Sequence, residues 1–340
     1  MLESLFDKLR VLIRRTVGGS FCICMCFLLV LSEVSCSTHD DEMNEYYMDY
    51  INQHGAVFRN NMLTTDGDTL RILSLGNSFS MDMLSDVPML AASAKIPSHS
   101  YSFYMVAKSG ATLSDYASLC AKDAALRKQG QGDEGFVIYN MGGISIETIE
   151  SASYSSISDL LSLPWDVIVL QQRSTLSSYF SSFTPYLPYL LLHITEICPN
   201  PNLSIYWHQT WSYPSDSGTK PSGLYGYEQI CGAVARMASE FGVYNIIPVG
   251  TAVQNMRMTN ITCGHELTRD GAHLDLGAGR LLAAMTFFNT VMLPYFKTDL
   301  DIIAVDDICR EKNIDSETYS ICLRCARDAC SYPLWVTYHY

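Results

Sequence analysis

Short, strongly apolar runs alternate with stretches of helical periodicity across residues 71–291, and this alternation most narrowly limits the fold. The apolar runs, which predict buried strands, are Arg71–Leu75, Ser102–Ala107, Asp166–Leu170, Leu203–Trp207 and Tyr244–Val249. The stretches with apolar residues at helical spacing are Asp82–Lys95, Pro185–Ile197, Tyr225–Phe241 and Gly277–Val291. Strands that alternate with helices predict βαβ units and a parallel sheet covered on both faces. We therefore expect an α/β fold, a three-layer αβα sandwich with about five strands in flavodoxin-like order.

The segment before the first strand predicts export. Four basic residues precede the apolar run FCICMCFLLVL at 21–31, which is too short to span a bilayer comfortably but has the length of a secretion signal. Cys36 follows the small residue Ser35, and acidic residues come soon after it. This arrangement resembles a bacterial lipoprotein signal, in which Cys36 would carry the lipid, whereas Glu33 departs from that pattern. Ordinary signal cleavage near Ser35 therefore remains an alternative, with a periplasmic or secreted product in place of an outer-membrane or cell-surface lipoprotein.

Composition and cysteine spacing narrow the functional classes. The formal net charge of −13 argues against nucleic-acid binding, which usually requires a basic face. Cys322 and Cys325, with Cys330, resemble part of a zinc motif, but no second CxxC or paired His accompanies them, so we interpret them as buried helix thiols. We expect no metal site and no cofactor. The predicted division of the chain is a signal at 1–36, a tether and lead-in at 37–66, the main α/β domain at 67–300 and a packed helical extension at 301–340.

Two motifs carry residues suited to nucleophilic chemistry. Ser78, in Gly-Asn-Ser after the first strand, lies where a tight strand-to-helix turn can expose a hydroxyl above the sheet. Asp270 and His273 stand three residues apart in one loop after the fifth strand. His273 can take the proton from Ser78 while Asp270 orients the imidazole. Taken singly, each motif is also explained as a helix cap or a surface turn.

In combination, the motifs resemble the SGNH, or GDSL-type, serine hydrolase superfamily. The segments LGNSFS, LQQRS, YWHQTWSY, IIPVGTAVQNMR and RDGAHLDLGAGR occur in order and look like an uncharacterised branch in which Asn77 replaces the usual Asp. The resemblance implies a catalytic triad of Ser78, His273 and Asp270. It also implies an oxyanion hole built from the N–H groups of Ser78 and Gly110 and a side-chain amide after the third strand. That last position departs from the family's Gly-x-Asn-Asp, and we assign it to Gln172, with Gln171 as the alternative.

Further residues follow the same strand ends and are candidates for substrate binding. They are Asn77, Gln171, His208, Trp211, Tyr213, Asn255 and Arg257. Trp211 and Tyr213 would form a wall on which a sugar ring stacks, although both are equally explained as core aromatics. Asn255 and Arg257 would bind substrate or brace the histidine loop.

The resemblance implies an exported serine esterase that removes acyl groups, acetyl above all, from carbohydrate through an acyl-enzyme. Its partners would be a small acylated carbohydrate or other ester and, through the lipid anchor alone, a membrane. The alternatives are a lipase or thioesterase for longer acyl chains and a non-catalytic glycan-binding surface lipoprotein.

Overall fold

The computed structural model describes residues 69–130, 135–151, 156–260, 265–298, 300 and 304–337. All of them belong to one compact unit of the chain, Tyr47–Tyr340. The predicted signal at 1–36, its Cys36 and the tether at 37–66 lie outside the described residues and stay predictions.

Within the described residues, seven strands form one sheet in the order β3-β4-β2-β1-β5-β6-β7. The strands are β1 (Leu70–Gly76), β2 (Tyr101–Ala107), β3 (Arg127–Lys128), β4 (Val137–Gly143), β5 (Val167–Leu170), β6 (Ser204–His208) and β7 (Asn245–Ile247). The predicted strands correspond to β1, β2, β5, β6 and β7, which are mutually parallel and follow the flavodoxin-like order 2-1-3-4-5.

The expected number of about five strands was wrong, because β3 and β4 extend the sheet beyond β2. β4 pairs antiparallel with β2, and the two-residue β3 pairs with β4. The second half of β4 reads Asn-Met-Gly-Gly and is only partly buried, so it lacks the continuous apolar run that marks the central strands.

Helices connect the strands. The α-helices are α3 (Ser78–Leu84), α4 (Val87–Ser93), α5 (Leu113–Ala121), α6 (Glu147–Ser151), α7 (Ile157–Leu161), α8 (Tyr186–Ile197), α9 (Gly223–Phe241), α10 (Val249–Arg257), α11 (Ala278–Phe287), α12 (Leu293–Phe296), α13 (Val305–Lys312) and α14 (Ser316–Ser331). Short 3-10 turns η1 (Ser98–Ser100) and η2 (Phe180–Ser182) and a π-helical turn η3 (Phe288–Met292) complete them. The single helix expected over Asp82–Lys95 is two helices, α3 and α4, and Pro88 lies in the first turn of the second.

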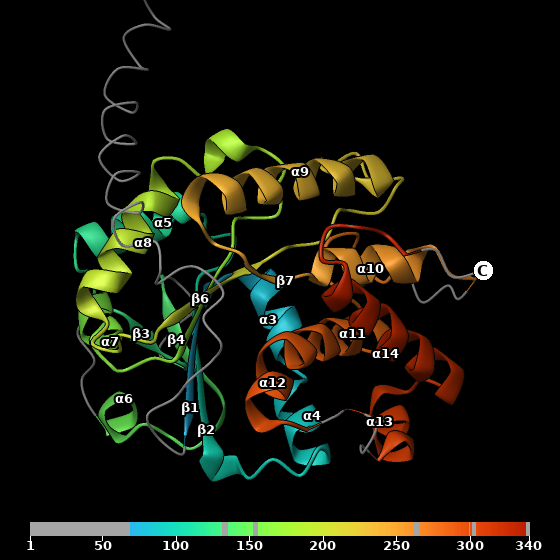
Figure 1. Cartoon of the computed structure of the whole chain (residues 1–340), viewed down its shortest axis with the longest axis horizontal. Helices are drawn as coiled ribbons and strands as arrows, with labels where there is room; N and C mark the ends of the chain where they lie inside the picture. The colour runs from blue at the N-terminus through green and yellow to red at the C-terminus, as the bar shows by residue number, and fades with distance from the viewer. Residues whose placement is uncertain are drawn as a thin grey trace, which may run out of the picture. The chain divides into compact units, whose positions relative to one another are not determined.

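The sheet separates two hydrophobic cores. Alternate side chains of the central strands point to opposite faces, so Ile72 and Val169 lie in one core while Leu73 and Ile168 lie in the other. Helices α3, α4, α10, α11 and α14 cover the first face, and α5, α7, α8 and α9 cover the second. Figure 1 shows these two helical layers on either side of the strands. The fold is therefore a mostly parallel sheet flanked by helices, as an αβα arrangement requires.

The C-terminal helices belong to the first core. Cys322, Cys325 and Ala326 of α14 are fully buried against α10 and α11. Cys322 and Cys325 lie on the buried face of this helix, as the interpretation of their spacing as helix thiols predicts.

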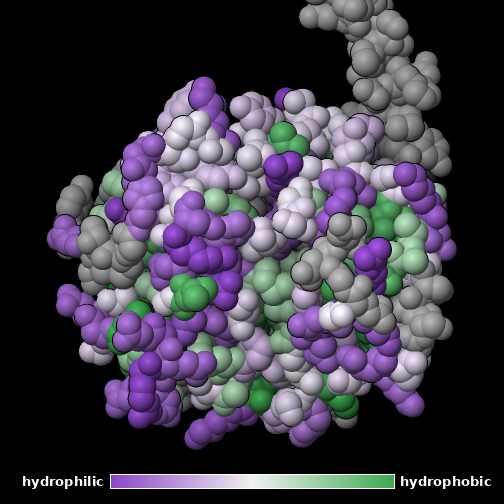
Figure 2. Space-filling view, turned by 180° about the vertical axis from the view of Figure 1, so that it is seen from behind, coloured by the Kyte–Doolittle hydropathy of each residue, from purple (hydrophilic) through white to green (hydrophobic). Residues whose placement is uncertain are grey.

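The surface is largely hydrophilic on the side drawn in Figure 2, where the hydrophobic residues occur in small groups among polar ones. The large hydrophobic side chains with the greatest exposure include Tyr225 and Trp335. Among the described residues, no helix combines the length and hydropathy needed to cross a membrane.

Candidate active site

The carboxyl ends of the parallel strands bring the predicted triad together. The Ser78 hydroxyl donates to His273 Nε2 across 2.9 Å, and His273 Nδ1 donates to Asp270 Oδ2 across 2.7 Å. Because the Asp270 carboxylate only accepts hydrogen bonds, it fixes the tautomer in which Nδ1 carries the proton and Nε2 is free to accept one. The three side chains therefore form a continuous hydrogen-bonded relay that ends at the Ser78 oxygen, in which His273 is the group that can take the proton.

Asp270 is held as an anion by its own turn. Partial burial raises its pKa, but hydrogen bonds from the His273 backbone N–H and side chain and from the Ala272 N–H outweigh that effect and lower the pKa to about 2. The carboxylate consequently stays charged at any pH at which the histidine works as a base.

The turn before Ser78 is tight. Asn77 caps α3, since its Oδ1 accepts from the Phe79 N–H at 3.0 Å, and its Nδ2 donates to the Ala111 carbonyl at 2.9 Å. Gly76 is required just before this cap, because a Cβ there would lie 2.1 Å from Ser80 Oγ. This packing leaves Ser78 partly exposed at the first position of α3 while Ser80 is buried.

Buried aromatic residues support the loop that carries Asp270 and His273. The Trp211 ring stacks on Phe79 with centroids 4.2 Å apart, and its indole N–H donates to the Ala272 carbonyl at 2.8 Å. Phe79 in turn lies 5.7 Å from the His273 ring. Trp211 is fully buried, so the prediction that it stacks on a sugar was wrong. It instead links the helix that carries Ser78 to the loop that carries His273.

Asp82, which sequence reasoning did not select, anchors the same loop from α3. Its carboxylate is 1% exposed and accepts from Arg269, Arg280 and the Leu274 N–H. Arg269 and Leu274 flank the Asp270–His273 turn, so Asp82 holds that turn against α3, the helix that begins at Ser78. The available signal was the spacing of Asp82 four residues after Ser78, which puts both on one helix face.

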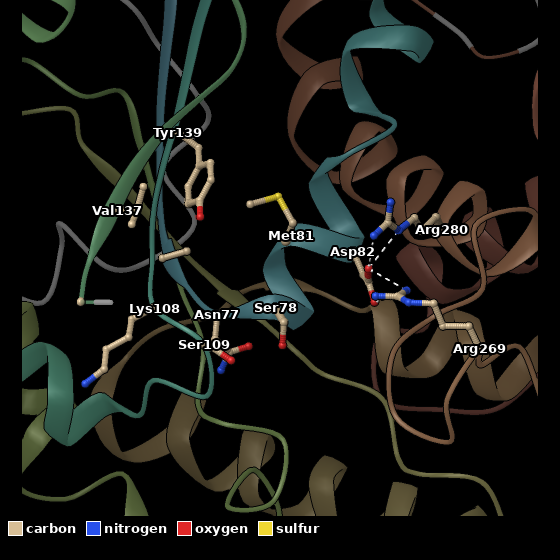
Figure 3. Close-up of a pocket in the computed structure, with 12 residues that line it drawn as sticks. Asn77, Ser78, Met81, Asp82, Lys108, Ser109, Val137, Tyr139, Arg269 and Arg280 are labelled. Carbon is tan, nitrogen blue, oxygen red and sulfur yellow. Dashed lines mark hydrogen bonds and ion pairs between the residues drawn. The ribbon is translucent and has the colours of Figure 1, made fainter. Parts of the chain in front are cut away.

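A pocket with a volume of about 250 Å³ opens beside Ser78. In Figure 3, Tyr139 of β4 and Lys108 lie on one side of Ser78 and Met81, and the Asp82–Arg269–Arg280 cluster lies on their other side. Among the described residues that line this pocket, Tyr139 is the one aromatic side chain, and it comes from a strand that the sequence did not predict. Among the described residues, no group of three or more His, Cys, Asp or Glu side chains could hold a metal ion.

The two glutamine candidates do not face this pocket. The Gln172 amide donates to the Ser182 carbonyl at 2.8 Å, and its oxygen accepts from the Leu113 N–H at 3.2 Å. Gln171 accepts from buried Ser80 and from His208 Nδ1, and its amide nitrogen is itself buried. The assignment of Gln172 to the oxyanion hole was therefore wrong, because its amide nitrogen is bound to Ser182. The Gln171 amide nitrogen has no partner among the described residues, so that alternative stays a prediction.

The remaining predicted binding residues are also structural. His208 is fully buried, which lowers its pKa to about 3 and keeps it neutral. The Tyr213 hydroxyl pairs with Ser174 at 2.8 Å, and Asn255 accepts from the Thr337 N–H at 2.9 Å. Arg257 donates to the carbonyls of Glu266 and Ser212 and so supports the chain before the histidine loop. The substrate-binding role predicted for these residues is corrected to one of bracing, whereas Asn77, a buried cap that also lines the pocket, keeps its predicted role as a prediction.

The Gln172→Ala variant tests this correction. We expect kcat to change by less than about tenfold, because the amide does not reach the reacting carbonyl. The free energy of unfolding should instead fall by about 1–3 kcal/mol, since buried groups of Leu113 and Ser182 lose their partner. Urea unfolding and initial rates on the same preparation measure both quantities. A hundredfold loss of kcat with unchanged stability would restore the original assignment.

One cationic residue does lie beside the predicted oxyanion donor Gly110. Gly110 has φ +63°, a conformation that favours glycine, and a Cβ there would lie 3.8 Å from the Cζ of Arg173. Arg173 is exposed and follows the two buried glutamines directly. The sequence analysis did not select Arg173, because it considered only side-chain amides for the donor after the third strand.

The family model described as "Domain of unknown function (DUF4886)" matches residues 71–300. Among solved structures, a crystal structure of a DUF4886 family protein from Bacteroides uniformis ATCC 8492 shares 25% identity with a TM-score of 0.58, covering 79% of this chain and 98% of that one. The protein BT4096, described as a gut microbial diltiazem-metabolizing enzyme, shares 13% identity with a TM-score of 0.36, covering 68% of this chain and 48% of that one; so weak a likeness supports no inference. No curated protein matches the chain significantly.

Proposed function

The chain belongs to the DUF4886 family, and we propose that it is a serine esterase of the SGNH type that removes short acyl groups, acetyl above all, from carbohydrates. The observation that carries this proposal is the unbroken chain of hydrogen bonds from Ser78 through His273 to Asp270. A serine held at 2.9 Å from a correctly oriented imidazole is the arrangement needed for acyl transfer.

In the proposed reaction, Ser78 Oγ attacks the ester carbonyl carbon while His273 Nε2 takes its proton. The tetrahedral intermediate collapses as His273 returns that proton to the departing alcohol, which leaves an acyl group on Ser78. Water then attacks the acyl-enzyme with the same histidine as base, and the carboxylic acid leaves. Asp270 stabilises the imidazolium that forms twice in each cycle.

The developing oxyanion would be held by backbone donors. The first donor is the N–H of Ser78, the residue at which α3 begins. The second is the N–H of Gly110, which lies on the loop that a hydrogen bond from Asn77 to the Ala111 carbonyl holds against that helix. Arg173 lies beside Gly110 and would add a cationic guanidinium next to this donor. Fixed donors of this kind lower the barrier because they need no reorganisation during the reaction.

The pocket favours a short acyl group. Its volume of about 250 Å³ is below that of most drug-sized ligand sites, which begin at roughly 300 Å³. A long acyl chain would need an apolar tunnel, whereas four of the lining residues are charged. A lipase or thioesterase for long chains is therefore the less favoured alternative. A non-catalytic glycan-binding role is also less favoured, because it does not require the hydrogen bonds that connect Ser78, His273 and Asp270.

Release of carboxylic acid from matched esters tests the proposal. We expect the purified protein to release acetate from an acetylated sugar, and to hydrolyse 4-nitrophenyl acetate at least about tenfold faster than the octanoate, given the pocket size. A preference for the octanoate would support the long-chain alternative. Binding of glycans without hydrolysis of any of these esters would support the non-catalytic one.

A further inference from the structure

Two arginines converge on one buried carboxylate in the wall of the active-site pocket. Arg269 Nη1 lies 3.1 Å from each Asp82 oxygen, and Arg280 Nη2 lies 2.7 Å from Oδ1. Figure 3 shows both guanidinium groups meeting Asp82 on the side of the pocket away from Lys108. Their side chains remain 34% and 22% exposed, although that of Asp82 is 1% exposed. The carboxylate of this cluster is therefore buried, and its two guanidinium groups are accessible to a ligand.

The charges of the cluster do not cancel. Asp82 neutralises one guanidinium and leaves one positive charge in excess. The other charged residue that lines the pocket, Lys108, is paired with Asp115 at 3.7 Å and adds little. The pocket wall is thus cationic in a chain whose formal net charge is −13. A second arginine is not needed to satisfy Asp82, because Arg269 and the Leu274 N–H already bind both of its oxygens.

The arginines also keep hydrogen-bond donors to spare. Asp82 takes Nη1 of Arg269 and Nε and Nη2 of Arg280, and the Leu274 carbonyl also accepts from Arg269 Nη1. Within the part of the chain that the structure describes, Nε and Nη2 of Arg269 and Nη1 of Arg280 have no acceptor. Guanidinium donors in this planar arrangement match the two oxygens of a carboxylate.

We propose that Arg269 and Arg280 form a subsite for a carboxylate on the substrate, so that the preferred esters are acylated acidic sugars. The inference rests on the proposed esterase function. Asp82 stands four residues after Ser78 on α3, so the subsite lies about one helical turn, roughly 5–6 Å, from the nucleophile. A sugar carboxylate a few bonds from an acetyl ester can span that separation.

The test compares O-acetylated glucuronate with O-acetylated glucose, which differ only in a carboxylate in place of a hydroxymethyl group. We expect kcat/KM to favour the glucuronate ester by about tenfold, and the preference to fall as ionic strength rises. In Arg280→Met the ratio of the two kcat/KM values should drop towards one. The ratio is insensitive to a general loss of activity, and Asp82 keeps two partners in this variant. Arg310→Met, which removes an exposed charge on α13, should retain the wild-type ratio.

A binding measurement separates this proposal from the proposed function. Calorimetric titration of glucuronate into the wild-type protein should show binding that glucose does not show, and Arg280→Met should abolish it. Equal hydrolysis of both esters without glucuronate binding would overturn the carboxylate subsite and leave the esterase intact. Glucuronate binding that depends on Arg280, without hydrolysis of any ester, would keep the subsite and reject the esterase.

Discussion

Replacing Ser78 with alanine is expected to lower kcat for ester hydrolysis by about 10⁴- to 10⁶-fold, because the proposed acyl-enzyme forms on its hydroxyl oxygen. Ser78 is the serine whose hydroxyl reaches His273, and it lines the pocket. KM should change little, since the lost hydroxyl contributes mainly to the transition state. Steady-state rates on 4-nitrophenyl acetate, with circular dichroism to show that the fold is intact, measure the effect.

Ser80→Ala is the matched control in the same turn. Ser80 is fully buried, and its hydroxyl donates to Gln171 and lies 3.5 Å from His208 Nδ1. Its loss should reduce the free energy of unfolding by about 1–3 kcal/mol and leave kcat within about tenfold of the wild type. A folded Ser80→Ala protein without activity, beside an active Ser78→Ala protein, would move the nucleophile to Ser80.

His273→Ala is expected to produce a loss of the same order, about 10⁴- to 10⁶-fold in kcat, because the serine then lacks its base. The double variant Ser78→Ala, His273→Ala should be no slower than either single variant, since the two residues act as one unit. Arg269 and Leu274 still bind Asp82, so the loop is expected to keep its position. Additive losses in the double variant would contradict a shared relay, and so would a His273→Ala protein with near-normal kcat.

The sequence was most informative where the determinants are local. An apolar run followed by a tight turn identifies the end of a buried strand, and parallel strands end at one edge of a sheet. For this reason the motifs around Ser78, Gly110 and Asp270 to His273 were predicted at that edge, where the structure has them. β4 escaped prediction because its half-exposed, glycine-containing end lacks such a run.

Side-chain direction was the main source of error. Whether Gln172 faces the pocket or the packed interior depends on where Ser182 and the Leu113 N–H lie, and both come from other parts of the chain. The aromatic residues around Trp211 would suit a sugar-binding surface as well as a hydrophobic core. Trp211 belongs to the core because its ring stacks on Phe79 and its indole N–H donates to the Ala272 carbonyl, and the sequence does not show either contact. The sequence did not predict the role of Asp82, because its partners Arg269 and Arg280 are 187 and 198 residues away along the chain.

The measurement that tests the central claim most directly is covalent labelling of the wild-type protein with a fluorophosphonate, followed by peptide mass spectrometry. Such probes phosphonylate a serine that a neighbouring base activates. We expect one adduct, on the peptide that contains Ser78, and fragmentation should assign it to Ser78 and not to Ser80. Labelling should be lost in the His273→Ala variant. An adduct on another serine, or no adduct on the folded protein, would contradict the account of Ser78 as the activated nucleophile.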